Sequence, residues 1–98
     1  MPVYQVSYDN INTERVKEAL FSLLEREIKD DKDLTSADPI CYAQSSVWFI
    51  DTPHETVGTN LSFIKFDDKD ILVTKIYSRN SVKANKQHVK DWLDYHLR

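Results

Sequence analysis

The stretch Val3-Tyr4-Gln5-Val6-Ser7-Tyr8-Asp9-Asn10 decides the fold that this sequence predicts. Its alternation is typical of a β-strand, with Gln5, Ser7 and Asp9 on one face and Tyr4, Val6 and Tyr8 on the other. Aromatic and β-branched residues favour such a strand. A helix layer can cover the apolar row, whereas the polar row must face solvent, a ligand or a second subunit. Asp9 lies where the strand gives way to a loop, and it is the acidic side chain that this pattern singles out.

Length and composition predict one domain over residues 1–98, with a small core built from 41% hydrophobic residues. Cys41 is the only cysteine, which excludes an internal disulfide and suits a reducing compartment. No apolar run approaches the roughly 18 residues that span a bilayer, and no signal-peptide pattern is present. We therefore expect a cytoplasmic protein that has no membrane partner.

The net charge of −3 argues against indiscriminate nucleic-acid binding, but the charge is unevenly distributed. Residues 1–64 carry five basic and eleven acidic residues, a net charge of −6, and residues 65–98 carry eight and five, a net charge of +3. The last third could therefore present a basic surface to an anionic partner. The alternative is a solvated helix face, since exposed charges often contribute little.

The clearest helix begins after Asn12, a plausible N-cap, and should end near Lys29. Its apolar stripe recurs at helical spacing and comprises Val16, Ala19, Leu20, Leu23, Leu24 and Ile28. The acidic segment 30–39 then predicts a solvated loop, because its spacing does not match a calcium-binding loop. Residues 40–44 and 46–51 are rich in strand-formers and predict two strands, or one strand bent near Ser45.

The second half of the chain is less uniform. Thr52-Pro53-His54-Glu55 has the pattern of a capping box, so a helix over 52–66 is favoured, but a strand over 61–66 remains open because Gly58 weakens the helix. Residues 71–77 predict a strand and 78–86 a loop. Asn85 is a candidate cap for a last helix, whose apolar side comprises Val89, Trp92, Leu93, His96 and Leu97.

This order of elements predicts an α+β fold, a ferredoxin-like sandwich of βαββαβ type with an added C-terminal helix. Its two principal helices cover one face of the sheet, and the other face stays open unless something covers it. The open face and the abundance of Tyr and Trp, which are enriched at interfaces, favour a homodimer.

Few residue patterns in this chain point to chemistry. Gly58 is the only glycine, which excludes phosphate-binding glycine loops, and His54, His88 and His96 lack the partners of a zinc site. Packed or surface roles are expected for His88 and His96, and a buried apolar role for Cys41. Asp9 alone binds a divalent metal weakly, but two copies across a two-fold axis could share one ion. Otherwise Asp9 satisfies nearby loop amides.

Four stretches together resemble the small SinR-like bacterial proteins, which are related to the CRISPR-associated "Cas-two" family and the VapD ribonucleases. They are Tyr4-Gln5-Val6-Ser7-Tyr8-Asp9, Ser45-Ser46-Val47-Trp48-Phe49-Ile50-Asp51-Thr52, Asp68-Lys69-Asp70-Ile71-Leu72-Val73-Thr74-Lys75-Ile76 and Asp91-Trp92-Leu93. The resemblance implies a ferredoxin-like homodimer. It also places Asp9 at the position of the aspartate proposed to bind metal and cleave nucleic acid in the CRISPR-associated relatives.

Two functions follow from these observations. The favoured one is a dimeric, non-catalytic module that binds protein or nucleic acid, in nucleic-acid defence or its inhibition; an acidic protein can mimic nucleic acid and occlude a basic partner. The alternative is a metal-dependent endonuclease or endoribonuclease, in which Asp9 of each copy holds a shared Mg²⁺ or Mn²⁺. Shared fold does not carry activity, so the composition weighs more here than the resemblance.

Overall fold

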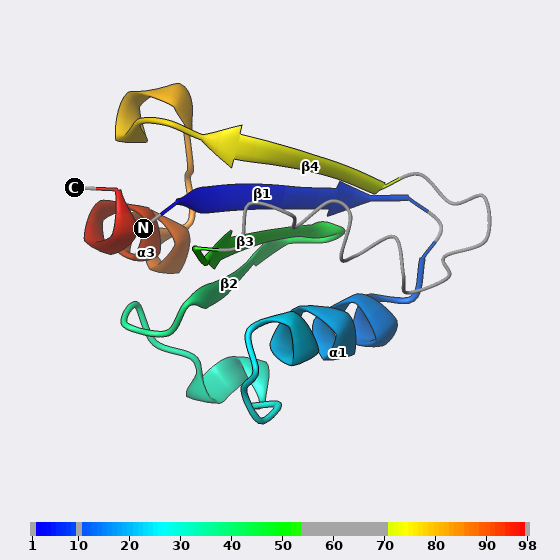
Figure 1. Ribbon diagram of the computed structural model, residues 1–98. Coiled ribbons are helices and arrows are strands. Elements are labelled where there is room, and N and C mark those ends of the chain that lie inside the picture. Colours follow the sequence, from blue (N-terminus) through cyan, green and yellow to red (C-terminus); the bar gives the residue numbers. More distant parts are fainter. Residues whose placement is uncertain (1, 10, 54–70, 98) are drawn as a thin grey trace.

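The computed structural model describes residues 2–9, 11–53 and 71–97 of the chain (Figure 1). In chain order these form β1 (Val3–Tyr8), α1 (Thr13–Leu23), η1 (Asp31–Asp33), β2 (Ile40–Gln44), β3 (Val47–Asp51), β4 (Ile71–Ile76), η2 (Arg79–Ser81) and α3 (Gln87–His96), where η marks a short 3-10 helix. The segment for which helix and strand were both open, residues 55–66, lies outside the described residues.

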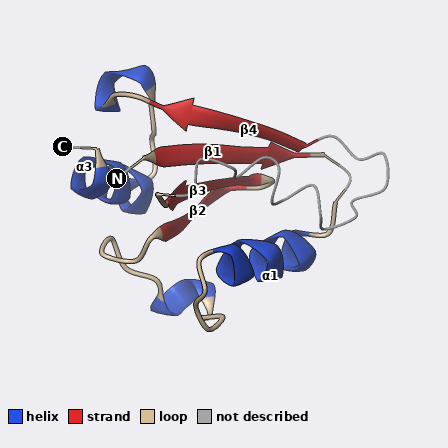
Figure 2. Cartoon of the chain, in the orientation of Figure 1, coloured by secondary structure: helices blue, strands red, loops and turns tan. Residues whose placement is uncertain are grey.

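The described residues form a four-stranded antiparallel sheet with the order β2-β3-β1-β4, in which β1 is an inner strand (Figure 2). Val6 lies opposite Trp48 of β3 on one side and Val73 of β4 on the other. β2 and β3 are two strands joined through Ser45 and Ser46, not one bent strand. This α+β architecture is compatible with the predicted ferredoxin-like sandwich.

The two faces of the sheet are covered by different helices. Tyr4, Val6 and Tyr8 are buried with α1, as the alternation in β1 predicted. Val3 points to the opposite face, where it belongs to a second core with Phe49 and with residues of α3. The last helix therefore partly covers the face expected to be open. On that face Gln5, Ser7 and Val47 remain half-buried, and Leu72 is 69% exposed.

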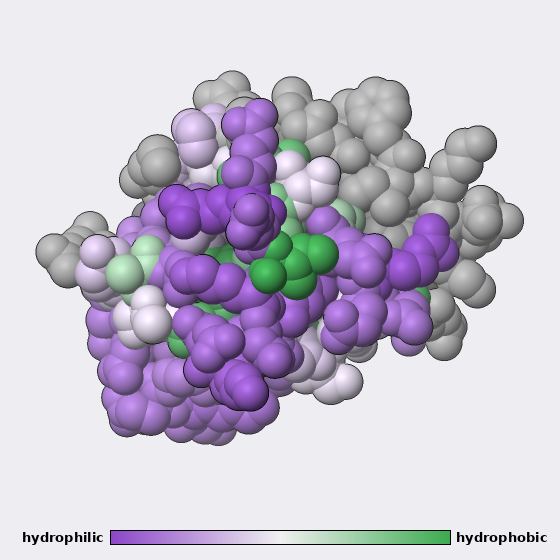
Figure 3. Space-filling view, turned by 90° about the horizontal axis from the view of Figure 1, so that it is seen from below, coloured by the Kyte–Doolittle hydropathy of each residue, from purple (hydrophilic) through white to green (hydrophobic). Residues whose placement is uncertain are grey.

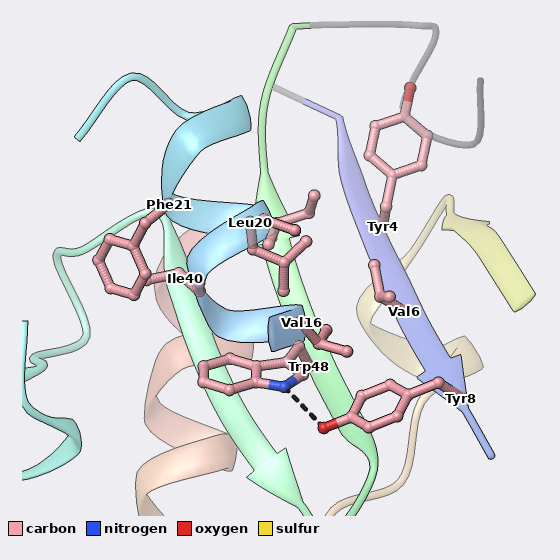
Figure 4. Packing of buried hydrophobic residues seen from close by; sticks show 10 residues of the cluster. Tyr4, Val6, Tyr8, Val16, Leu20, Phe21, Ile40 and Trp48 are labelled. Atoms are coloured by element: carbon pink, nitrogen blue, oxygen red, sulfur yellow. Dashed lines mark hydrogen bonds between the residues drawn. The ribbon is translucent and has the colours of Figure 1, made fainter. Parts of the chain in front are cut away.

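The core beneath α1 is centred on Trp48, which is fully buried (Figure 4). Its indole Nε1 donates a hydrogen bond of 3.1 Å to the Tyr8 hydroxyl, which in turn donates to Thr13 Oγ1 at 3.1 Å. These bonds satisfy polar atoms that would otherwise be costly to bury. They also join β3, β1 and the first turn of α1, and so fix the strand end that precedes Asp9.

α1 begins as predicted, because the Asn12 side chain accepts a 2.8 Å hydrogen bond from the Glu14 N–H. The predicted end near Lys29 is wrong, since α1 ends at Leu23. Arg26 N–H bonds to the Phe21 carbonyl, and Glu25 lies in the left-handed region with φ 56°. This cap reverses the chain. Ile28, expected in the apolar stripe, is consequently 56% exposed.

α3 begins at Gln87, one residue later than Asn85 would allow as the cap. Lys86 occupies the N-cap position and forms no side-chain capping hydrogen bond, so the assignment of Asn85 is wrong. The predicted apolar side is confirmed for Val89, Trp92 and Leu93, which are buried in the second core. Among the described residues, no helix combines the length and apolar character needed to cross a membrane.

The surface beside α1 and η1, seen from below in the orientation of Figure 1, is mostly hydrophilic, with a hydrophobic area near its centre and smaller ones around it (Figure 3). The acidic residues Asp30, Asp31 and Asp33 are exposed there, as the predicted solvated loop requires. The prediction is wrong for the end of this loop, because Asp38 is buried.

Candidate functional site

Asp9, the predicted catalytic and metal-binding residue, is exposed directly after β1. The residue before it is held in place, because the Tyr8 hydroxyl bonds to Trp48 and the Tyr8 N–H bonds to the Ser46 carbonyl at 3.1 Å. Within residues 2–9, 11–53 and 71–97, no three His, Cys, Asp or Glu side chains gather to hold a metal ion. A metal at Asp9 would thus need ligands from outside this set of residues. The metal-binding and catalytic role of Asp9 stays a prediction.

Asp38 organises the end of the acidic segment. Its carboxylate accepts hydrogen bonds from the Thr35 N–H at 2.8 Å, the Thr35 hydroxyl at 3.3 Å and the Lys29 ammonium at 3.0 Å. Burial raises the pKa of Asp38, but the Thr35 N–H and then the Lys29 ammonium outweigh burial and hold the pKa below its usual value. The resulting stabilisation is present above the unfolded-state pKa and is lost as pH falls through the lower folded-state pKa.

A second polar centre joins the end of α3 to the middle of the chain at His96. Its Nδ1 lies 2.6 Å from Asp51 Oδ2, at the end of β3, and its Nε2 lies 2.8 Å from the Ser36 carbonyl oxygen. The imidazole stacks on Trp92, with ring centroids 4.0 Å apart. The side chains of His96 and Asp51 are only 6% and 12% exposed. The centre therefore ties α3 to β3 and to the 35–38 turn.

The proton positions in this centre follow from its acceptors. A carbonyl oxygen can only accept, so Nε2 of His96 carries a hydrogen and donates it to Ser36. One further proton lies between Nδ1 and Asp51 Oδ2, and the bond is charge-assisted when that proton is on the imidazole. Because both ring nitrogens are engaged, this imidazole is poorly placed to act as a base, and its packed role agrees with the sequence prediction.

A hollow of about 460 Å³ lies along β2, an outer strand of the described sheet; we call it the edge hollow. The segment 31–36 and the first turns of α3 form its walls. The Pro39 carbonyl accepts a hydrogen bond from the Asp51 N–H and so faces β3. Because backbone groups alternate in direction along a strand, the N–H and C=O groups of Ile40 and Tyr42 point away from β3. His88 Nε2 donates to the Tyr42 carbonyl at 3.0 Å.

Two groups of the edge hollow that could act as nucleophile or base, Cys41 and His88, are restrained. Burial raises the pKa of the Cys41 thiol to about 12, so the thiol is protonated at neutral pH, as a buried apolar role predicts. His88 is engaged with the Tyr42 carbonyl, although its side chain is exposed. The hollow thus presents an apolar floor, including Ile40 and Trp92, beneath a polar rim.

Sequence reasoning did not find the His96 centre or the buried Asp38. Asp51 and His96 are separated by 45 residues, and Ser36 and His96 by 60, so no local spacing connects them. The signal in the sequence that could have indicated this centre is the presence of His96 on the apolar side of the last helix, one turn after Trp92. By contrast, the predicted position of Asp9 at a strand end is confirmed. The alternation of apolar and polar residues that predicted it is a local property of the sequence.

The chain matches no protein-family model, and no curated protein or solved structure is significantly similar to it.

Proposed function

We propose that this chain is a non-catalytic binding module with a ferredoxin-like fold of βαββαβ type and a C-terminal helix, and that it works as a homodimer. The edge hollow carries this proposal. It is large enough for a ligand, and its thiol and imidazole are committed to burial and to a structural hydrogen bond. A cavity of this character supports recognition better than reaction.

The rim of the edge hollow favours an extended protein segment as the partner. Asp31 and Asp91 line it together with Lys86 and His88, so it offers both signs of charge. A nucleic-acid backbone would meet the two carboxylates, whereas a polypeptide can match a mixed rim. The outward backbone groups of Ile40 could pair with an added strand, in the manner of β-augmentation. Nucleic-acid defence or its inhibition is the pathway that the SinR-like resemblance suggests for such a partner.

Selection from a displayed random-peptide library tests the proposed partner class. Peptides enriched on the wild type should perturb backbone amide resonances of Ile40–Gln44 and bind Asp91→Arg about tenfold more weakly, because the new side chain fills the rim and reverses its charge. Glu18→Arg makes the same charge change at an exposed position of α1 and should bind as wild type does. The proposal would be contradicted if the selected peptides bound Asp91→Arg as tightly as the wild type, or if the library contained no peptide that binds.

The homodimer is supported by the exposed apolar side chains of β4 and its end. Leu72 is 69% exposed and Tyr77 is 82% exposed, and a second copy could cover both. Light scattering at micromolar concentration should therefore show a species of twice the 11.5 kDa chain mass. A purely monomeric protein would remove the dimer from the proposal and leave the edge hollow intact.

The alternative function is a metal-dependent nuclease, and the exposure of Asp9 at a defined strand end favours it. Asp9→Asn removes the charge that a shared Mg²⁺ or Mn²⁺ would need while nearly preserving shape. We expect wild type and Asp9→Asn to show the same background on RNA and DNA substrates with either metal. Cleavage by the wild type that the substitution abolishes, with fold and dimer retained, would replace the binding function with the nuclease.

A further inference from the structure

A second cavity, of about 310 Å³, lies on the face of the sheet that α3 partly covers; we call it the sheet hollow. It is bounded by β1, β2 and β3 on one side and by residues 82–86 and α3 on the other. Phe49, Ala43 and Val89 are buried side chains that form its floor, and Val47, Val82 and Ala84 extend this apolar surface. The floor suits a flat apolar group.

The rim of the sheet hollow is positively charged. Lys83 and Lys86 line it, and the residues around it include no Asp or Glu. Both lysines are exposed, and among the described ion pairs neither has a carboxylate partner. Their ammonium groups are therefore available to a ligand, and binding an anion would not require breaking an ion pair with a described residue.

Neutral polar groups add donors to the same rim. Gln5, Gln44 and Asn85 line the hollow, and Gln5 uses one amide hydrogen on Ser7 Oγ at 3.0 Å, which leaves its second hydrogen free. α3 begins beside the hollow with Lys86 at its uncapped N-terminus, where the helix dipole is positive. Cationic, amide and helix-end donors thus converge above an apolar floor.

We propose that the sheet hollow binds a small organic anion, whose flat apolar body rests on Phe49 and Val89 and whose phosphate or carboxylate group bonds to Lys83 and Lys86. A volume of about 310 Å³ lies at the lower end of small-molecule pockets, which suits a body of one or two rings. Lys86 lines both hollows, but Lys83 lines the sheet hollow and not the edge hollow, so Lys83→Gln tests the anion site apart from the protein partner.

The test divides a probe into its two halves. 1-Naphthyl phosphate is titrated into the full chain beside inorganic phosphate and 1-naphthol, and backbone amide shifts are followed by NMR. The complete probe should shift residues 82–86 and Phe49, and should bind at least about tenfold more tightly than either half, since a charge-assisted contact and apolar burial add. Comparison with 1-naphthoate distinguishes a phosphate ligand from a carboxylate ligand.

Substitution of the rim lysines supplies the second readout. Lys83→Gln and Lys86→Gln should each weaken the binding of 1-naphthyl phosphate about tenfold and leave the binding of 1-naphthol unchanged, because only the anion loses a charged partner. Lys75→Gln, an exposed lysine in register with Tyr4 on the opposite face, is the matched control and should bind as wild type does. The proposal is overturned if 1-naphthol or inorganic phosphate binds as tightly as the complete probe. It is equally overturned by unaffected lysine variants, or by shifts that map outside the hollow.

Discussion

Replacing His96 by leucine is expected to lower the free energy of unfolding by about 3–5 kcal/mol, because it takes the hydrogen-bond donor away from a largely buried carboxylate. Leucine keeps an apolar contact with Trp92 but leaves the Asp51 carboxylate, which is 12% exposed, without its hydrogen-bond donor. The other oxygen of that carboxylate, Oδ1, is already buried and has no hydrogen-bond partner among the described residues. Urea denaturation at neutral pH measures the loss.

Replacing Asp51, the other member of the pair, should lower the free energy of unfolding by less. In Asp51→Asn the imidazole can remain neutral, with Nε2 still donating to Ser36 and Nδ1 accepting from the new amide, so we expect a loss of about 1–3 kcal/mol. The double variant His96→Leu with Asp51→Leu should recover part of the loss, because two apolar groups leave no charge unpaired.

His88→Leu is the matched control for the His96 centre. His88 is exposed and forms one hydrogen bond to the edge strand, so its replacement should change stability by no more than about 0.5 kcal/mol. An equal effect of His96→Leu and His88→Leu would show that the Asp51–His96 pair does not stabilise the fold.

Leu20→Ala is the second substitution with a large expected effect, a loss of about 2–5 kcal/mol. Leu20 is fully buried in the core that α1 forms with Trp48 and Ile50, and its truncation removes packed atoms and leaves a cavity. The denaturant midpoint should fall, with little change in the slope of the transition.

Two controls separate cavity formation from a general effect of mutation. Leu20→Met nearly conserves volume and should cost less than about 1.5 kcal/mol. Leu72→Ala removes the same atoms from a side chain that is 69% exposed, so stability should change little in the monomer. An unchanged midpoint for Leu20→Ala would mean that Leu20 is not in the core.

The binding function and the nuclease function require different parts of the same fold. The nuclease needs Asp9 from two copies to meet, whereas the binding module needs only the edge hollow of one copy. The edge hollow is built from described residues of a single chain, which is why it carries the preferred function.

The elements that the sequence determined by itself are those with a local periodic or capping signal. Alternation placed Tyr4, Val6 and Tyr8 on the buried face of β1 and Asp9 at its end. The cap at Asn12 and the apolar spacing around Leu20 and Trp92 identified both described helices. Each of these signals depends on neighbours within a few residues, so it can be read before the chain is folded.

The tertiary structure alone decided which groups met across the chain. α3 partly covers the sheet face that was expected to be open, and this places His96 against Asp51 and Ser36. Such contacts join residues dozens of positions apart, so they depend on how the helices and strands pack and not on the spacing of residues within any one of them.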